Sequence, residues 1–140
     1  MKKKVLFFIP SLEGGGAENV MVNILRQADK SKIEPVLILL DPFEHSPYRE
    51  LLPEYVRVIV VGRNSDRSVE KIRQFINFVK TVHREKPKTI LSMLTHSDIM
   101  AILAGMVFGI RVLICEHNTL GEVIKAREGK TMYGFLSPPW

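Results

Sequence analysis

Two short polar segments hold the residue types best suited to chemistry in this chain of 140 residues. Residues 14–18 read Gly-Gly-Gly-Ala-Glu and follow one apolar run, and residues 116–118 read Glu-His-Asn and follow another. Consecutive glycines let the backbone approach a ligand closely, and the N–H groups at the start of a following helix favour an anion such as phosphate. The pair predicts a phosphate-binding turn with a histidine beside it.

The elements that must position these segments are buried parallel strands. Residues 5–10 are a continuous apolar run, as expected of a strand that is covered on both faces, and residues 111–115 are predicted to form the fifth strand. The carboxyl ends of such strands open onto the binding crevice of an open sheet. We therefore expect Gly14, Gly15, Gly16, Glu18 and the 116–118 segment to line one site, although an unliganded tight turn would also use glycines.

The remaining pattern alternates strands and helices. Further strands are predicted over residues 36–40, 56–61 and 89–94, and helices over residues 17–28, 69–86 and 99–108, with a short helix within 47–52 and an exposed loop over 63–67. This order predicts a doubly wound, Rossmann-like parallel α/β sheet in a single domain.

Two helices carry strong apolar patterns. In the second helix, one stripe is predicted to face the core while the charged residues fall elsewhere; its members are Val69, Ile72, Phe75, Ile76, Val79 and Val82. The third helix, residues 99–108, is predicted to be buried nearly all round.

The stretches from Val5 to Glu18 and from Cys115 to Asn118 resemble the amino-terminal half of the family 4 retaining glycosyltransferases, which have the two-domain GT-B fold. The resemblance covers residues 3–122, and it implies transfer of a sugar from a nucleotide-sugar donor to a hydroxyl acceptor. It places His117 at the position of a cleft histidine that touches donor sugar or acceptor. It also places the glycine turn at the cleft.

The same resemblance implies that most of the donor site belongs to a second, carboxyl-terminal domain. Residues 1–122 would form the acceptor-side domain, and residues 123–140 would begin a missing segment or form an interface. The chain alone is then not expected to catalyse sugar transfer. The resemblance also implies no bound catalytic metal and no cofactor.

Residues 95–98 read Thr-His-Ser-Asp and follow the fourth predicted strand. Adjacent residues cannot form a catalytic triad, whose members face each other across space. Thr95 and Asp98 instead fit a helix-capping pattern, and His96 is a candidate cleft residue. No cluster has metal-ligand spacing, because Asp98, Glu116 and the two histidines would need the fold to gather them.

Two other functions stay open. In a dinucleotide-binding oxidoreductase domain, Asp41 after the second strand would hold the ribose, but the consecutive glycines depart from the spaced fingerprint. A non-catalytic module would recruit a partner chain or a membrane. The tail supports this through its apolar residues and through Lys125, Arg127 and Lys130, for which a solvated basic segment is the simpler interpretation.

Composition narrows the partners and the compartment. The net charge of +5 and a pI near 9.5 favour anionic partners. Among these anionic partners, nucleic acid is a weak candidate because the basic residues are dispersed and show no recognition motif. Cys115 is the single cysteine, so we expect no internal disulfide. We also expect a cytoplasmic location, which includes the inner face of the membrane if the chain contacts lipid. The longest apolar run, 99–110, is too short to span a bilayer.

Overall fold

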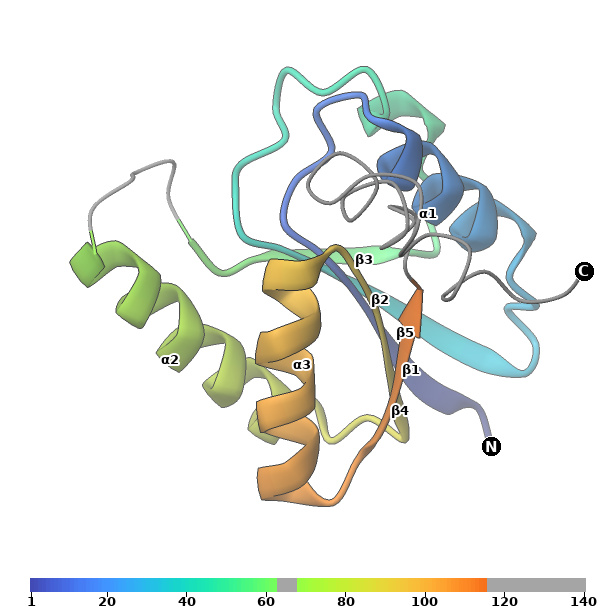
Figure 1. Cartoon of the computed structure of the whole chain (residues 1–140). Helices are drawn as coiled ribbons and strands as arrows, with labels where there is room; N and C mark the ends of the chain where they lie inside the picture. Colours follow the sequence, from blue (N-terminus) through green and yellow to red (C-terminus); the bar gives the residue numbers. More distant parts are fainter. Residues whose placement is uncertain (63–67, 116–140) are drawn as a thin grey trace, which may run out of the picture.

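The computed structural model describes residues 1–62 and 68–115. Five strands form one parallel sheet in the order β3-β2-β1-β4-β5 (Figure 1). The strands are β1 (Lys3–Ile9), β2 (Ile33–Leu39), β3 (Arg57–Val60), β4 (Thr89–Met93) and β5 (Arg111–Cys115), and the helices are α1 (Gly16–Gln27), α2 (Ser68–Glu85), α3 (Thr95–Phe108) and a 3-10 turn, η1 (Arg49–Leu51). The predicted doubly wound α/β fold is confirmed.

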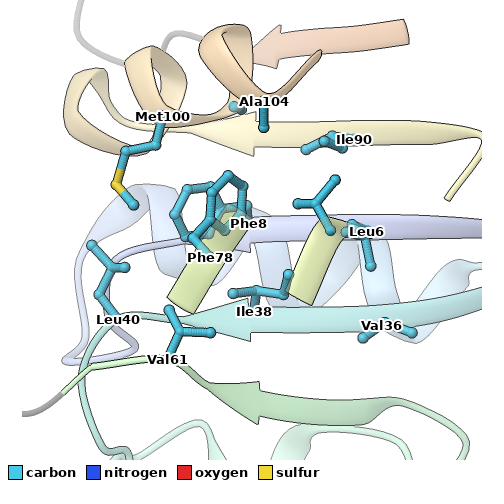
Figure 2. Packing of buried hydrophobic residues seen from close by; sticks show 12 residues of the cluster. Leu6, Phe8, Val36, Ile38, Leu40, Val61, Phe78, Ile90, Met100 and Ala104 are labelled. Carbon is cyan, nitrogen blue, oxygen red and sulfur yellow. The ribbon is translucent and has the colours of Figure 1, made fainter. Parts of the chain in front are cut away.

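Helix α1 covers one face of the sheet, and α2 and α3 cover the other (Figure 1). Successive strand residues point to opposite faces, so Phe7 packs in the α1 cluster with Met21, while Phe8 packs in the α2–α3 cluster. The Phe8 and Phe78 rings stack with centroids 4.2 Å apart (Figure 2). Two apolar cores thus fix the sheet between its helical layers.

The predicted burial of the α2 stripe holds for Val82 and Phe75, which pack in the core, but is wrong for three of its other members. Val69 and Ile72 are 70% and 62% exposed, and Ile76 is exposed as well. The side of α2 that faces the sheet carries Val82 from the edge of the stripe, together with Phe78, which is not a member of it. Alongside these two lie four buried polar or charged residues, Glu70, Gln74, Thr81 and Glu85. The stacking of Phe78 and the ion pairs of Glu85 therefore set the rotation of the helix, and the part of the stripe formed by Val69, Ile72 and Ile76 points outward.

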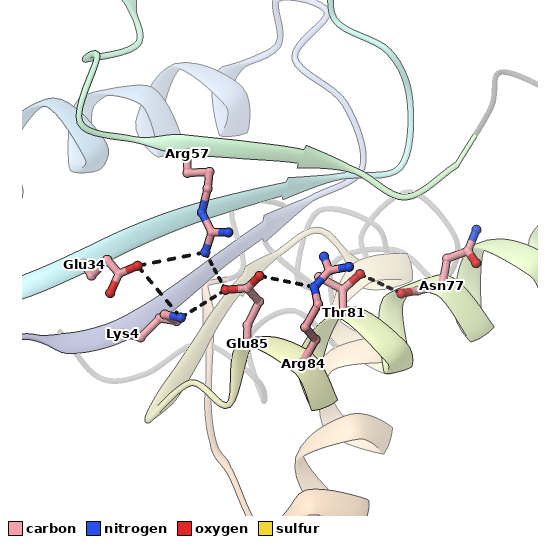
Figure 3. A network of polar contacts seen from close by, with 7 residues as sticks. All are labelled: Lys4, Glu34, Arg57, Asn77, Thr81, Arg84 and Glu85. Atoms are coloured by element: carbon pink, nitrogen blue, oxygen red, sulfur yellow. Dashed lines mark hydrogen bonds and ion pairs between the residues drawn. The ribbon is translucent and has the colours of Figure 1, made fainter.

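An ion-pair network explains part of this rotation (Figure 3). Glu85, whose side chain is nearly buried, accepts hydrogen bonds from Arg57 and from Lys4, the latter at 3.1 Å between Nζ and Oε2. Burial raises the pKa of Glu85, but the hydrogen bonds from Arg57 and Lys4 outweigh it and hold the pKa below its usual value. The end of α2 is thereby tied to β1 and β3.

The predicted all-round burial of α3 is also wrong. Small residues, Ala101, Ala104 and Gly105, face the sheet, where a Cβ on Gly105 would lie 2.4 Å from Val112. The larger apolar residues, which are Ile99, Ile102, Leu103, Met106 and Val107, are exposed. The small residues allow close packing on β5, and the bulky ones are left outside because the described residues cover only the sheet side of this helix.

The other predicted elements match closely, except that α3 begins at Thr95 rather than at residue 99. The short helix within 47–52 is the 3-10 turn η1, and the predicted loop 63–67 lies outside the described residues. Within the described part of the chain, no helix combines the length and apolar content that a membrane span requires.

Candidate functional site

The direction of winding reverses between β1 and β4, which are neighbours in the sheet. The chain leaves β1 towards α1 on one face, and it leaves β4 towards α3 on the other (Figure 1). Ligands of open α/β sheets bind in the crevice outside the strand ends at such a reversal. The loop 10–15 and the start of α3 therefore border the candidate site.

The glycine turn contains one glycine that the backbone requires and one that it does not. Gly14 has φ +116°, a conformation that L side chains rarely adopt. Gly16, the first residue of α1, has a negative φ, and a Cβ built on it meets nothing within 4 Å. Because the described protein atoms leave this side of Gly16 open, a ligand has room to approach the backbone there.

The start of α1 has the electrostatics of an anion site. Gly15 is the N-cap and supplies no side-chain hydrogen bond. The first N–H groups of a helix have no intrahelical acceptor and carry the positive end of the dipole. The Glu18 carboxylate lies close by, with Oε2 2.3 Å from the position of a Cβ on Gly15. Glu18 thus holds a negative charge at the place where a phosphate would be favoured.

The second border of the site contains backbone strain. Leu94, between β4 and α3, has φ 75° and ψ 140°, a region that non-glycine residues rarely occupy. Ser97 stabilises this turn, because its hydroxyl donates to the carbonyls of Met93 and Leu94, the latter at 2.9 Å. The predicted capping by Thr95 is wrong, since Leu94 is the N-cap and α3 begins at Thr95 without a side-chain cap. Strain of this kind clusters at functional sites.

The structure locates some of the predicted site residues and leaves others untested. Gly14, Gly15, Gly16 and Glu18 lie at the end of β1, and His96 is exposed in the first turn of α3 at the same edge. The residues with the strongest predicted roles, His117 and Asn118, lie outside the described residues, as does the 123–140 tail. Their roles stay predictions.

A cavity of about 330 Å³ beside the glycine turn was not predicted. It lies between the loops that follow β1 and β2, and its walls include Glu13, Phe43, Glu44 and His45. The second loop is braced against the first, because the Ser46 hydroxyl donates to the carbonyl of Leu12. The sequence signal that could have identified His45 is its place in the loop after the second strand, at the crevice edge.

Within the described ranges 1–62 and 68–115, no group of three or more histidine, cysteine or acidic side chains could hold a metal ion. The site that the structure describes therefore consists of backbone N–H groups, carboxylates and exposed histidines. Such groups can bind a phosphate and hydroxyl groups.

No family model matches this chain, and no curated protein matches its sequence. Solved structures do match its fold. The apo form of the lipopolysaccharide outer core galactosyltransferase WaaB has a TM-score of 0.63 at 18% identity, over 81% of this chain and 32% of WaaB. Phytolacca americana UGT2, solved with UDP-2-fluoro-glucose and pterostilbene, has a TM-score of 0.60 at 12% identity, over 83% of this chain and 31% of UGT2.

A third match is a Listeria monocytogenes protein assigned as a UDP-N-acetylglucosamine 2-epimerase. Its TM-score is 0.62 at 12% identity, over 95% of this chain and 36% of the Listeria protein. At these identities the matches show the fold, which is the Rossmann-like α/β domain of GT-B proteins. The chain spans about a third of the length of each of these three structures.

Proposed function

We propose that this chain is the acceptor-side domain of a retaining glycosyltransferase, which transfers a sugar from a nucleotide-sugar donor to a hydroxyl acceptor. The observation that carries the proposal is the open backbone at Gly16, beside the uncapped start of α1 and at the reversal between β1 and β4. The fold shared with a galactosyltransferase and with UGT2 supports it. The resemblance to family 4 supports the retaining mechanism.

In this proposal the two loops have different tasks. The first turn of α1 binds a donor phosphate, after the Glu18 carboxylate has moved aside. The cavity beside it receives the acceptor, whose hydroxyl groups find hydrogen-bond acceptors in the carboxylates of Glu13 and Glu44. His117, Asn118 and His96 complete the cleft.

The rest of the donor site is proposed to come from a second domain, on the same or another polypeptide. This division agrees with the one-third coverage of the matched structures. We therefore expect the 140-residue chain to bind donor nucleotide weakly and to transfer no sugar by itself.

An NMR titration of the 140-residue chain with UDP tests the phosphate site. We expect amide shifts confined to the glycine turn and to the first turn of α3. Gly16→Ala should fold normally, because a methyl group meets no protein atom there. It should weaken UDP binding about tenfold, since a lost charge-assisted hydrogen bond costs roughly 1.5 kcal/mol. Shifts elsewhere, or none with UDP, ADP and GDP, would contradict the proposal.

The position of Asp41 favours a second candidate, a dinucleotide-binding oxidoreductase domain. Asp41 follows β2 and its N–H donates to the carbonyl of Pro10 at 3.1 Å, so it lies at the crevice edge where a ribose-binding acid belongs. The same titration with NAD decides between the two. Binding of NAD with shifts at Asp41, in preference to UDP, would select the oxidoreductase.

A further inference from the structure

The segment from α2 to β5 carries its charges unevenly. Residues 68–115 contain seven lysines and arginines, and all of them are exposed. The same residues contain three acids, Glu70, Glu85 and Asp98, and all three are buried. Residues 1–62, in contrast, contain eight basic and eight acidic residues. Two of the exposed arginines pair with these acids, Arg73 with Glu70 and Arg84 with Glu85, each at 3.6 Å. The other exposed charged side chains of residues 68–115 are all basic, so the net charge of this surface is positive.

The same segment exposes large apolar side chains. Met106 and Val107 are 77% and 72% exposed. We call the exposed apolar side of these two helices the α2–α3 face; its members are Val69, Ile72 and Ile76 on α2, and Ile99, Ile102, Leu103, Met106 and Val107 on α3. Large exposed apolar patches with a polar rim mark contact with a protein or a membrane.

Basic groups border this face along one flank and at one end. At about 100° per residue, Arg73, Lys80 and Arg84 fall on the flank of α2 that lies across Ile76 from Val79. Beyond the carboxyl ends of the helices lies a cavity of about 380 Å³, and its walls include His83, Lys86, Lys88 and Phe108. An apolar centre with a cationic border is the pattern of a protein that lies on an anionic membrane.

We propose that the α2–α3 face docks on an anionic lipid bilayer. The apolar side chains of α3 enter the headgroup boundary, and the lysines and arginines around them contact lipid phosphates. This inference goes beyond the proposed sugar transfer and does not depend on it.

Charge complementarity selects a bilayer over a second copy of the chain. Two copies that paired through this face would bring basic borders together, and among residues 68–115 no exposed acid is present to neutralise them. An anionic bilayer neutralises the same groups and accepts the apolar side chains in a single plane.

Flotation of the full 140-residue chain with lipid vesicles tests the proposal. One set contains phosphatidylcholine alone, and the other contains phosphatidylcholine and phosphatidylglycerol in equal amounts. We expect binding to the second set alone and release by salt. Lys80→Glu should weaken binding by roughly twentyfold, because each basic residue near the surface contributes about fivefold and the acid repels the lipid. Arg26→Glu, on the outer side of α1, is the matched control and should bind normally.

A second pair of variants tests the apolar contact. Met106→Asn should weaken flotation, whereas Leu51→Asn, an exposed apolar residue in η1, should not. Equal binding to both vesicle sets, or none, would overturn the proposal. So would a dimer that Met106→Asn converts to monomer, which assigns the face to a second copy. A large loss of thermal stability in Met106→Asn would also overturn it, because the face would then be covered within the chain.

Discussion

The two helical layers that cover the sheet are built in opposite ways. Helix α1 buries apolar residues such as Met21 and Leu25, and its outer side carries Asn19, Asn23 and Arg26. On the other side of the sheet, the α2–α3 face leaves eight large apolar residues in solvent. Among the described residues, every buried polar side chain belongs to this second side: Glu70, Gln74, Thr81, Glu85, Ser92, Ser97 and Asp98.

This difference teaches that apolar content does not by itself define the inner face of a helix. In α1 the apolar and buried positions coincide. In α2 the apolar residues Val69, Ile72 and Ile76 point outward, because Phe78 and the ion pairs of Glu85 hold the opposite side against the sheet. An exposed stripe of this kind is the feature on which the proposed membrane contact rests.

The largest effect should come from the core of α2. We expect Phe78→Ala to destabilise the chain by about 3–5 kcal/mol, since it removes a buried ring stacked on Phe8 and leaves a cavity. Ile72→Ala, on the exposed stripe, should change the free energy of unfolding by less than about 0.5 kcal/mol. Urea unfolding measures both. If Ile72→Ala lost as much stability as Phe78→Ala, the exposed stripe would have to be packed in the folded protein. The two helical layers would then not differ in the burial of their apolar residues.

The next largest loss of stability should come from Glu85, which accepts hydrogen bonds from Arg57 and Lys4. Glu85→Gln should cost roughly 1.5–3 kcal/mol at neutral pH, which is the range for hydrogen bonds to charged groups. Because the folded pKa is lowered, the stabilisation is complete above the unfolded pKa of about 4.3 and is lost as the pH falls through the folded value. The gap between wild type and variant should therefore close on going from pH 7 to pH 3 in thermal melts. A constant gap would mean that Glu85 acts through packing alone.

The sequence predicted the fold well because that fold depends on signals within each segment. Buried parallel strands are continuous apolar runs, and the glycine turn marks the junction of β1 and α1. The orientation of α2 was not predictable in this way, because the partners of Glu85 lie 28 and 81 residues away along the chain.

Of the candidate site, the sequence predicted the glycine turn and His96, whose roles stay predictions, but not the cavity that includes His45 and Glu44. A cavity arises only where two loops are brought together, and no spacing within one loop reveals it. The start of α3 was missed for a related reason, since Leu94 occupies a backbone conformation that its residue type disfavours.

Two serines on the α2–α3 side of the sheet should have opposite effects on the free energy of unfolding, each of about 1 kcal/mol. The Ser92 hydroxyl is fully buried and has no hydrogen-bond partner among the described residues, whereas the Ser97 hydroxyl donates to two carbonyls. Ser92→Ala should stabilise the chain by about 1 kcal/mol, and Ser97→Ala should destabilise it by a similar amount. Chemical denaturation measures the free energy of unfolding of both variants. A destabilised Ser92→Ala would show that the Ser92 hydroxyl has a hydrogen-bond partner and is not an unsatisfied polar group of this layer.

The smallest effect compares the residues that follow the two long helices on either side of the sheet. Lys86, after α2, has φ +48°, whereas Ala28, after α1, has φ −62°. Glycine adopts the first conformation without the steric cost of a Cβ, so Lys86→Gly should stabilise the chain by about 0.5–1 kcal/mol. Ala28→Gly should destabilise it by about 0.4–1 kcal/mol, because glycine gains freedom in the unfolded state and relieves no strain at a negative φ. Thermal melts of the two variants should shift in opposite directions. A shift in the same direction would show that the turn after α2 is held without strain, and that the two layers differ in their surfaces but not in how their helices end.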